Sequence, residues 1–392
     1  MNIVVLGGGY AGVMSAARLA RRTRGKGVSI TLVNPSELFV ERLRMHQVAA
    51  GHELAHHRIP DLLGNRVVFV QGCAKAIDTV GGEVTVSAAG GMRALPYDRL
   101  VYALGSSTDA GIVPGVSDHA YTLNDPRLAR RMALRMAALD EIGGTIAVCG
   151  GGLTGIEAAT EIAENHPALR VTLISRQRPG WMMGEKARAH VIAAFARLGV
   201  TVLANAEITK VLPGAVALAG GETVPADVCL WTAGVRSPAL AAESGIAVDG
   251  GGRVLVDASL RSQSHPEIYA VGDAAAVRQA WGPIHGTSQS GMPSGAHAAD
   301  CIAREMSGKK VRPFRFGYFH QPVSLGREDA VIQFVRHDDS PRHWYLRGKA
   351  AVAYKEMISR SPITMYGWVR RYPLPAALSK GGRATRKPFM PL

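Results

Sequence analysis

Near its start the chain carries Gly7-Gly8-Gly9-Tyr10-Ala11-Gly12, set between the apolar run Ile3 to Leu6 and a helical pattern from Val13 to Arg22. Gly7, Gly9 and Gly12 fit the G-x-G-x-x-G fingerprint of a strand–turn–helix unit that binds a dinucleotide. The first glycine allows a tight turn, the second lets the backbone approach a pyrophosphate, and the third lets the helix pack against the strand. Free N–H groups and the dipole at the helix N-terminus would hold the phosphates. The sequence therefore predicts a dinucleotide site at these glycines.

The same pattern returns 143 residues further on (150 − 7). A strand is predicted over Thr145 to Cys149, Gly150, Gly152 and Gly155 repeat the fingerprint, and a helical pattern follows. One fingerprint can arise by chance, whereas two in matching contexts are strong evidence for two dinucleotide sites. We therefore predict an α/β fold with two Rossmann-like dinucleotide-binding domains and a smaller C-terminal α+β region.

The end of the second strand in each unit indicates how the ribose is recognised, because an Asp or Glu at this place binds the ribose hydroxyls. Asn34 occupies it in the first unit and can still form hydrogen bonds, without charge assistance. Ser175 occupies it in the second unit and is followed by Arg176 and Arg178. Guanidinium groups bind phosphate in a bidentate manner, so we expect a preference for NADPH over NADH. The alternative is that these two are ordinary surface arginines of a basic protein.

The composition is that of a protein with several buried cores. The chain has 392 residues, of which 47% are hydrophobic, and this length suggests two or three domains. No apolar stretch approaches the length of a membrane helix, and the chain opens directly into a strand without a leader. We therefore expect a cytoplasmic protein. The four cysteines form no C-x-x-C pair and are expected to be buried, reduced thiols.

A second motif, His52-Glu53-Leu54-Ala55-His56, matches the H-E-x-x-H signature of zinc proteases. It lies inside the first nucleotide-binding unit, between Gly51 and Pro60. A zinc site needs both histidines on one helical face and a third ligand. We therefore interpret the motif as a surface helix and predict no metal site.

The positive charge is concentrated at the end of the chain. The formal net charge is +14, and seven lysines and arginines follow the last acidic residue, Glu356. Such a tail suits nucleic acid, an anionic membrane or an acidic partner, or is a solvated disordered segment. The segment Ile363 to Tyr372 mixes aromatic and basic residues, which indicates peripheral contact with the inner face of the cell membrane. Pro362 and Pro373 are expected to prevent a long helix there, and packing of Trp368 on the first domain or on a second subunit is the alternative.

Three further strands end in glycine turns. The first runs from Tyr97 through Ala103 to Gly105, the second from Ala226 to Gly234, and the third from Glu267 to Gly272-Asp273. In this order, with the two fingerprints, they resemble the two-dinucleotide flavoprotein family, and within it the type II NADH dehydrogenases and their NAD(P)H–FAD relatives. The resemblance covers residues 1 to about 360.

The resemblance implies an FAD-dependent NAD(P)H dehydrogenase. It implies FAD in the first domain, NADPH or NADH in the second, and hydride transfer from the nicotinamide to the flavin. Asp273 would bind the ribityl chain, Glu157 would lie near the nicotinamide, and Ser288-Gln289 would lie under the flavin pyrimidine. Lys355 would correspond to a lysine near the acceptor. The implied domains are 1–115 and 237–308 for FAD, 116–236 for NAD(P)H, and 309–392 for the C-terminal domain with its basic tail.

One departure concerns the electron acceptor. Type II dehydrogenases carry Ala-Gln-x-x-x-Gln at the quinone site, and Pro293 replaces the second glutamine here. We expect a small-molecule acceptor, a quinone or a quinone-like molecule. Two alternatives stay open: a reductase of a ferredoxin-like protein carrier, and a slowly turning-over flavin redox sensor. No nucleic-acid partner is expected, and a homodimer is left open.

Overall fold

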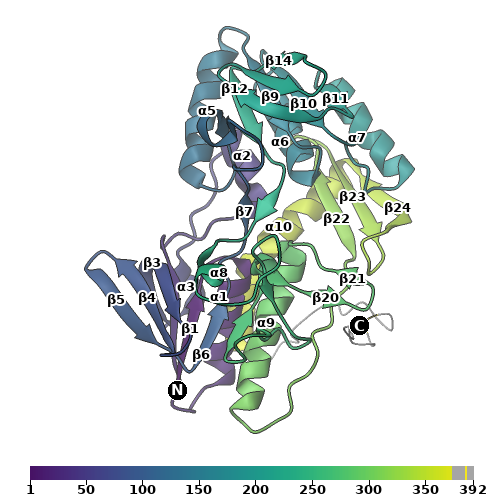
Figure 1. The fold of residues 1–392 in the computed structure, drawn as a ribbon. Helices are drawn as coiled ribbons and strands as arrows, with labels where there is room; N and C mark the ends of the chain where they lie inside the picture. The colour runs from purple at the N-terminus through teal and green to yellow at the C-terminus, as the bar shows by residue number, and fades with distance from the viewer. Residues whose placement is uncertain (373–384, 386–392) are drawn as a thin grey trace.

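The computed structural model describes residues 1–372 and 385, and the remainder of the basic tail lies outside the described residues. Figure 1 shows two α/β units, one above the other, with a small antiparallel sheet and a long C-terminal helix beside them. The predicted fold class, two Rossmann-like domains and a smaller C-terminal α+β region, is therefore confirmed.

The lower unit is built around β1 (Asn2–Leu6), which is buried from its second residue onward and lies inside a seven-stranded sheet of order β18-β6-β1-β2-β3-β4-β5. Its core strands β18, β6, β1, β2 and β3 run parallel, as expected of strands that are apolar on both faces. Helices α1 (Tyr10–Arg22) and α9 (Ser288–Glu305) pack against each other along the sheet. The other strands are β2 (Ser29–Asn34), β3 (Val68–Asp78), β4 (Glu83–Ala88), β5 (Gly91–Pro96), β6 (Arg99–Tyr102) and β18 (Ile268–Ala270).

The upper unit contains a five-stranded parallel sheet of order β11-β10-β9-β15-β8. Helix α5 (Pro126–Asp140) begins as the sequence predicts, because the Asp125 side chain accepts a hydrogen bond from the N–H of Arg127. The unit also contains α4 (Val116–His119), β8 (Ala120–Tyr121), β9 (Thr145–Cys149), α6 (Leu153–Asn165), β10 (Arg170–Ser175), α7 (Glu185–Arg197), β11 (Thr201–Ala204), β12 (Ile208–Leu212), β13 (Ala215–Leu218), β14 (Thr223–Pro225) and β15 (Val228–Trp231).

Two short strands connect the units. Strand β7 (Ser107–Thr108) leads upward and β16 (Val235–Arg236) leads back, and the two pair antiparallel (Figure 1). A third connection comes from the segment after β2: α2 (Met45–Ala49) leaves the lower unit and packs against α5 and α6. The smaller elements of the lower unit are η1 (Arg42–Arg44), α3 (Ile59–Leu63), α8 (Leu240–Glu243), β17 (Val254–Leu255), η2 (Gly272–Ala274), β19 (Ala275–Ala276), β20 (Arg278–Gln279) and β21 (Gly282–Pro283).

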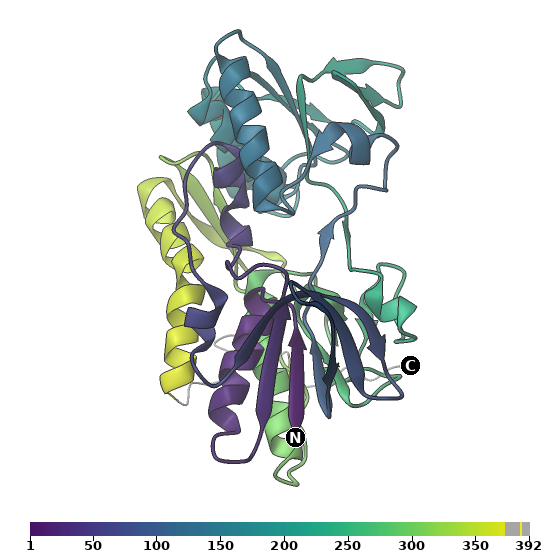
Figure 2. The same cartoon turned by 90° about the vertical axis from the view of Figure 1, so that its left-hand side faces the viewer.

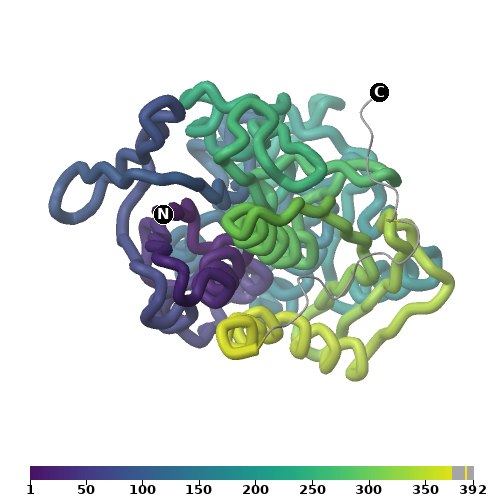
Figure 3. The backbone as a smooth tube through the Cα atoms, turned by 90° about the horizontal axis from the view of Figure 1, so that it is seen from below, coloured from purple at the N-terminus to yellow at the C-terminus, as the bar shows by residue number. Residues whose placement is uncertain are grey.

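The C-terminal region consists of the antiparallel strands β22 (His320–Ser324), β23 (Ala330–Val335) and β24 (Pro341–Arg347), followed by α10 (Gly348–Arg371). Helix α10 runs down the side of the molecule and lies beside α1, as Figures 2 and 3 show. None of the helices in the part of the chain that the structure describes is both long and apolar enough to cross a membrane.

The prediction that prolines would prevent a long helix after residue 362 is wrong, because α10 passes through Pro362 without a break. A proline leaves the carbonyl four residues earlier without its helical donor. Here the Ser361 hydroxyl donates to that carbonyl, the oxygen of Ile358, at 2.8 Å. The helix also gains burial, because Tyr366 and Val369 are almost completely buried against the lower unit.

Candidate functional site

The first fingerprint has the geometry of a phosphate-binding turn. Gly7 has φ +102°, and a Cβ at this residue would lie 2.4 Å from the Ala103 carbonyl oxygen. A Cβ at Gly12 would lie 1.9 Å from the Gly7 carbonyl oxygen, whereas a Cβ at Gly9 would meet no atom within 4 Å. Two of the three glycines are therefore needed for packing, and the middle one borders open space at the start of α1.

The second fingerprint repeats this geometry. Gly150 has φ +126°, and a Cβ at Gly155 would lie 1.8 Å from the Gly150 carbonyl oxygen. A Cβ at Gly152 would again meet no atom within 4 Å. Gly9 and Gly152 are the N-caps of α1 and α6, and neither helix has a side-chain cap, so their first N–H groups can bind an anion.

In each unit the polar residue predicted at the ribose position, Asn34 or Ser175, lies against the glycine turn of its fingerprint. The amide of Asn34 accepts from the N–H of Gly8 at 2.8 Å and donates to the Ser36 carbonyl at 2.7 Å. Asn34 therefore holds the glycine turn in shape, a role that the sequence pattern does not indicate. Ser175 lies against Gly151 in the same way, since a Cβ at Gly151 would lie 2.2 Å from its hydroxyl.

Arg176 and Arg178 follow β10 directly and are both exposed. No ion pair of either is found within residues 1–372 and 385, so both guanidinium groups are available beside the second fingerprint. This is the position from which a 2′-phosphate is recognised in such units.

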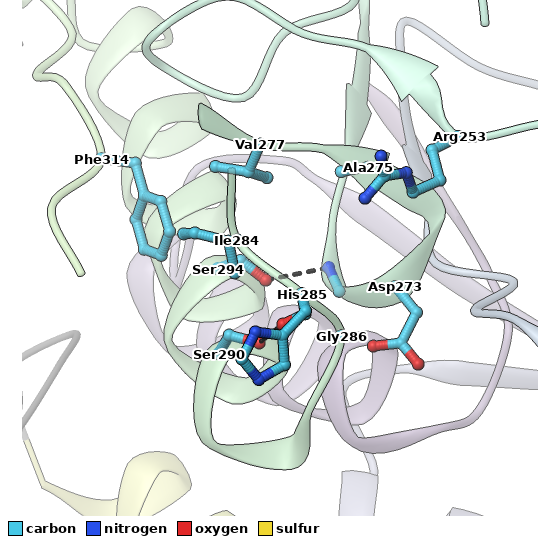
Figure 4. Close-up of a pocket in the computed structure, with 11 residues that line it drawn as sticks. Arg253, Asp273, Ala275, Val277, Ile284, His285, Gly286, Ser290, Ser294 and Phe314 are labelled. Carbon is cyan, nitrogen blue, oxygen red and sulfur yellow. Dashed lines mark hydrogen bonds between the residues drawn. The ribbon is translucent and has the colours of Figure 1, made fainter. Parts of the chain in front are cut away.

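Asp273 and its neighbours line a pocket at the carboxyl end of β18 (Figure 4). The Asp273 carboxylate accepts from the Ser106 hydroxyl at 3.0 Å, and a Cβ at Gly286 would lie 2.4 Å from it. Gly272 has φ +63° and donates its N–H to the Ser294 hydroxyl at 2.9 Å.

Ala103, Gly105 and Gly234 lie at the junction of the two units. Ala103 donates its N–H to the Leu6 carbonyl at 2.9 Å and forms the wall against which Gly7 packs. Gly105 and Gly234, with φ of +69° and +72°, flank the connecting strands β7 and β16. We infer that they shape the passage of the chain between the units, next to the predicted flavin site.

Ser288 is the first residue of α9, whose cap is formed by Thr287 and Ser290. The Gln289 amide donates to the His320 carbonyl at 3.0 Å and accepts from the N–H of Phe319 at 2.9 Å. Both polar ends of Gln289 therefore bind the backbone at the start of β22. Its predicted catalytic role stays a prediction, and its observed contacts fix α9 to the C-terminal sheet.

Glu157 and Lys355, which are 198 residues apart, form a buried ion pair. The Lys355 ammonium donates to Glu157 Oε1 at 2.5 Å and to the Pro322 carbonyl at 3.1 Å. Burial is the largest single effect and by itself would raise the pKa of Glu157. The charges of Lys355 and His46, together with hydrogen bonds from Lys355 and Ser324, outweigh burial and hold that pKa below its usual value. The structure thus joins two residues that the sequence assigned separately to the nicotinamide and the acceptor.

Sequence reasoning missed the charged groups around this pair. His46 on α2, Glu161 on α6 and Ser324 on β22 are all buried. Burial lowers the pKa of His46 to about 4 and raises the pKa of Glu161 to about 7. No sequence signal pointed to His46. Glu161 lies one helical turn after Glu157, so the i, i+4 spacing was the available clue.

The histidine motif differs from its predicted local structure. Residues 52–57 are an irregular segment between α2 and α3, so the surface helix predicted there is absent. The positive φ of Gly51, +101°, marks the point where the chain leaves the helical path of α2. Within the residues that the structure describes, no group of side chains has the arrangement needed to hold a metal ion.

The cysteines are free thiols, and three of the four are buried. Cys73 is exposed on β3, which corrects the expectation that all would be buried. Cys149 and Cys229 lie on adjacent strands with their sulfurs 3.6 Å apart. A hydrogen bond with Cys229, followed by burial, raises the pKa of the Cys149 thiol, so Cys149 stays a protonated thiol at neutral pH.

The residues present fit FAD and a nicotinamide dinucleotide. Each helix N-terminus faces a glycine that leaves room for a pyrophosphate, and the pocket at Asp273 places a carboxylate where a polyol chain can donate to it. The residues that would hold FAD are Gly7, Gly9, Gly12, Ala103, Gly105, Gly272, Asp273 and Ser288; those that would hold the nicotinamide nucleotide are Gly150, Gly152, Gly155, Arg176, Arg178 and Gly234.

Comparison with known proteins agrees with this geometry. Residues 1–299 match the family described as pyridine nucleotide-disulphide oxidoreductase. An NADH dehydrogenase-like protein of Mycobacterium tuberculosis is 31% identical, over 84% of this chain and 87% of that one. A type II NADH:quinone oxidoreductase of Staphylococcus epidermidis is 25% identical, over 94% of this chain and 96% of that one. The structure of NDH2 from Plasmodium falciparum in complex with NADH superposes with a TM-score of 0.78 at 14% identity, over 95% of this chain and 99% of that chain.

Proposed function

Because the chain belongs to the pyridine nucleotide-disulphide oxidoreductase family and is an NAD(P)H-dependent flavin oxidoreductase, we propose that its electron acceptor is a quinone or a quinone-like molecule. The observation that carries this proposal is the buried Glu157–Lys355 pair, which lies where the second fingerprint helix meets the C-terminal helix. A small acceptor reduced by two electrons needs such groups to supply protons and to balance charge in a site closed to water.

The chain positions its substrates through a few contacts. Helix α6 presents Gly152 to the pyrophosphate, and Arg176 and Arg178 bind the 2′-phosphate, which makes NADPH the preferred coenzyme. Asp273 accepts from the ribityl chain of FAD and keeps the flavin in place. When bound, the flavin supplies two-electron transfer between the nicotinamide and the acceptor. Glu157, held by Lys355 and by the N–H of Ser324 at 3.1 Å, rests as a carboxylate beside the nicotinamide and can take up a proton during acceptor reduction.

The identity of the acceptor is tested with purified protein that retains its flavin. NADPH is mixed with a soluble quinone, with an acidic ferredoxin and with no acceptor, and NADPH oxidation is followed. Rapid turnover with the quinone alone supports the proposal, and Lys355→Met should lower that rate. Turnover only with ferredoxin supports the carrier reductase, for which the net charge of +14 is suited to an acidic partner. Flavin that is reduced and stays reduced with every acceptor indicates a sensor.

We also propose that the end of α10 contacts the inner face of the cell membrane. Trp368 and Tyr372 are 51% and 57% exposed, and Arg371 is exposed beside them. This composition suits a membrane interface, where aromatic rings lie at the level of the lipid headgroups and a cation lies near anionic lipid. Truncation of the chain after Ser361 would remove the buried Tyr366 and Val369 together with the exposed residues, so truncation is a poor test.

Point variants test the membrane proposal without damaging the core. Trp368→Ser should reduce sedimentation of the protein with anionic liposomes at low salt. Trp344→Ser, at a similarly exposed tryptophan on β24, serves as the control. If the full chain stays in the supernatant, or if both variants sediment as the wild type does, the end of α10 is not a membrane anchor.

A further inference from the structure

Glu161 is a buried carboxyl group for which the proposed function has given no role. Its side chain has no exposed surface, and neither of its oxygens forms a hydrogen bond within the described residues. A carboxylate without hydrogen bonds is costly to bury, so such a group in a native protein calls for an explanation. Titratable side chains lie on both sides of Glu161, which suggests that its carboxyl group takes part in proton transfer.

On one side, Glu161 faces solvent through the His52 ring. His52 Nε2 lies 3.0 Å from Glu161 Oε1, and the His52 side chain is 33% exposed. The two atoms are close but not aligned for a hydrogen bond, so a small rotation of the ring is needed to make one. His52 is the first histidine of the H-E-x-x-H segment, and its partly exposed ring links Glu161 to the protein surface.

On the other side, Glu161 faces the Glu157–Lys355 pair through His46. His46 Nε2 lies 4.0 Å from Glu161 Oε2, and His46 Nδ1 lies 3.8 Å from Glu157 Oε2. The Ser324 hydroxyl lies 3.3 Å from His46 Nε2 and 3.1 Å from Glu157 Oε1. The imidazole and the hydroxyl therefore bridge the two carboxyl groups, and a movement of about 1 Å closes the remaining gap.

We propose that His52, Glu161, His46 and Ser324 form a proton relay from solvent to Glu157. The proposal rests on the proposed function, because reduction of a two-electron acceptor A needs a proton: NAD(P)H, one H⁺ and A give NAD(P)⁺ and AH₂. The hydride carries both electrons and one hydrogen. The second hydrogen is a proton from solvent, which Glu157 takes up from the relay and gives to the acceptor. Each relay residue accepts a proton on one atom and releases one from another, and the relay returns to its starting state.

The charges around Glu161 suit this role. Burial raises the pKa of its carboxyl group, Arg327 opposes that shift, and nearby carboxylates reinforce it. Glu161 therefore gains and loses a proton near neutral pH, as a relay group must. The titratable and charged groups that face it from α2, the segment after α2, the β22–β23 turn, α10 and its own helix are His46, His52, Arg327, Glu356, Glu157 and Glu164.

The relay is tested in the flavin-loaded full chain by measuring two steps separately. Anaerobic bleaching of the flavin by NAD(P)H reports hydride transfer, and a pH-indicator dye reports proton uptake during acceptor reduction. Glu161→Gln keeps the size of the side chain but cannot exchange a proton. We expect unchanged bleaching and proton uptake slowed about tenfold or more. Glu53→Gln, at an exposed carboxylate next to His52 in the sequence, is the matched control and should behave as the wild type.

A second variant at the surface covers the case in which Glu161→Gln does not fold. His52→Ala should slow proton uptake, and added imidazole should restore it, because the ring position is open to solvent. His56→Ala, at an exposed histidine of the same segment, should show neither effect. The relay alone is overturned if Glu161→Gln takes up protons at the wild-type rate. It is also overturned if added imidazole does not restore proton uptake in His52→Ala. A wild-type flavin that NAD(P)H does not bleach overturns the proposed function and the relay with it.

Discussion

At the scale of single residues, Glu161 gives the protein a pH dependence that needs no substrate to be observed. Its pKa rises from 4.5 to about 7 because the folded chain buries it. Between these two values the folded protein keeps a proton that the unfolded chain releases, so the free energy of unfolding falls as pH rises from about 4.5 to about 7. The stabilising contribution is complete below this range and lost above it.

Glu161→Gln should remove this pH dependence. Relative to the wild type, the variant should gain about 3 kcal/mol in unfolding free energy between pH 4.5 and pH 8, which is the energy of a shift of this size. Urea denaturation at both pH values measures the difference, with Glu53→Gln, at an exposed carboxylate, as the control. Parallel pH profiles for the wild type and Glu161→Gln would show that Glu161 does not hold a proton near neutral pH.

Coenzyme choice is also decided by single residues. Replacing Arg176 and Arg178 together by Ala removes the two exposed guanidinium groups beside the second fingerprint. Loss of a charged contact of about 1.5–3 kcal/mol should raise KM for NADPH about tenfold or more and leave KM for NADH nearly unchanged. Steady-state kinetics with both coenzymes provide the measurement. An equal change in both KM values would mean that these arginines do not read the 2′-phosphate.

At the scale of elements, α10 is stabilised at Pro362 by a side-chain hydrogen bond that replaces a missing backbone one. The Ser361 hydroxyl binds the Ile358 carbonyl that Pro362 leaves without a helical donor. Ser361→Ala should therefore lower the free energy of unfolding by about 1 kcal/mol.

The pair Ser361 and Pro362 can be tested as a double-mutant cycle. In a Pro362→Ala background the new N–H binds the Ile358 carbonyl, so Ser361→Ala should cost much less there than in the wild type. Denaturant unfolding of the four proteins gives the coupling energy. A coupling near zero would show that the hydroxyl does not replace the missing helical donor.

At the scale of the whole molecule, several contacts hold the upper unit, the lower unit and the C-terminal region together, and three of them differ in kind. Strands β7 and β16 pair at the crossing, α2 packs into the core of the upper unit, and Lys355 of α10 reaches Glu157 of α6. The ion pair is the one that can be removed cleanly, because both partners have neutral substitutes of similar size.

Lys355→Met should destabilise the molecule by about 3–5 kcal/mol, because it leaves the buried Glu157 charge without its partner. Lys355→Met combined with Glu157→Gln should recover most of that loss, since no charge then stays buried. Guanidinium unfolding of the single and double variants measures the effect. A double variant as unstable as Lys355→Met would assign the loss to packing and not to charge.

The sequence by itself determined the two nucleotide-binding turns. A G-x-G-x-x-G turn between a buried strand and a helix is governed by local sterics, which is why Gly7, Gly12, Gly150 and Gly155 could be placed without any knowledge of distant residues. The α/β class followed from the same repeats, and the Asp125 cap was equally local.

Only the tertiary structure determined which charged residues meet in the interior. His46 and His52 belong by sequence to the first nucleotide-binding unit, yet α2 carries them across to α6. Lys355 reaches Glu157 because α10 packs against the C-terminal sheet and α1, and Gln289 binds the backbone at the start of β22. A pKa depends on burial and on charges brought near by packing. Sequence periodicity and spacing reveal neither burial nor nearby charge, so the role proposed for Glu161 could be inferred only from the folded chain.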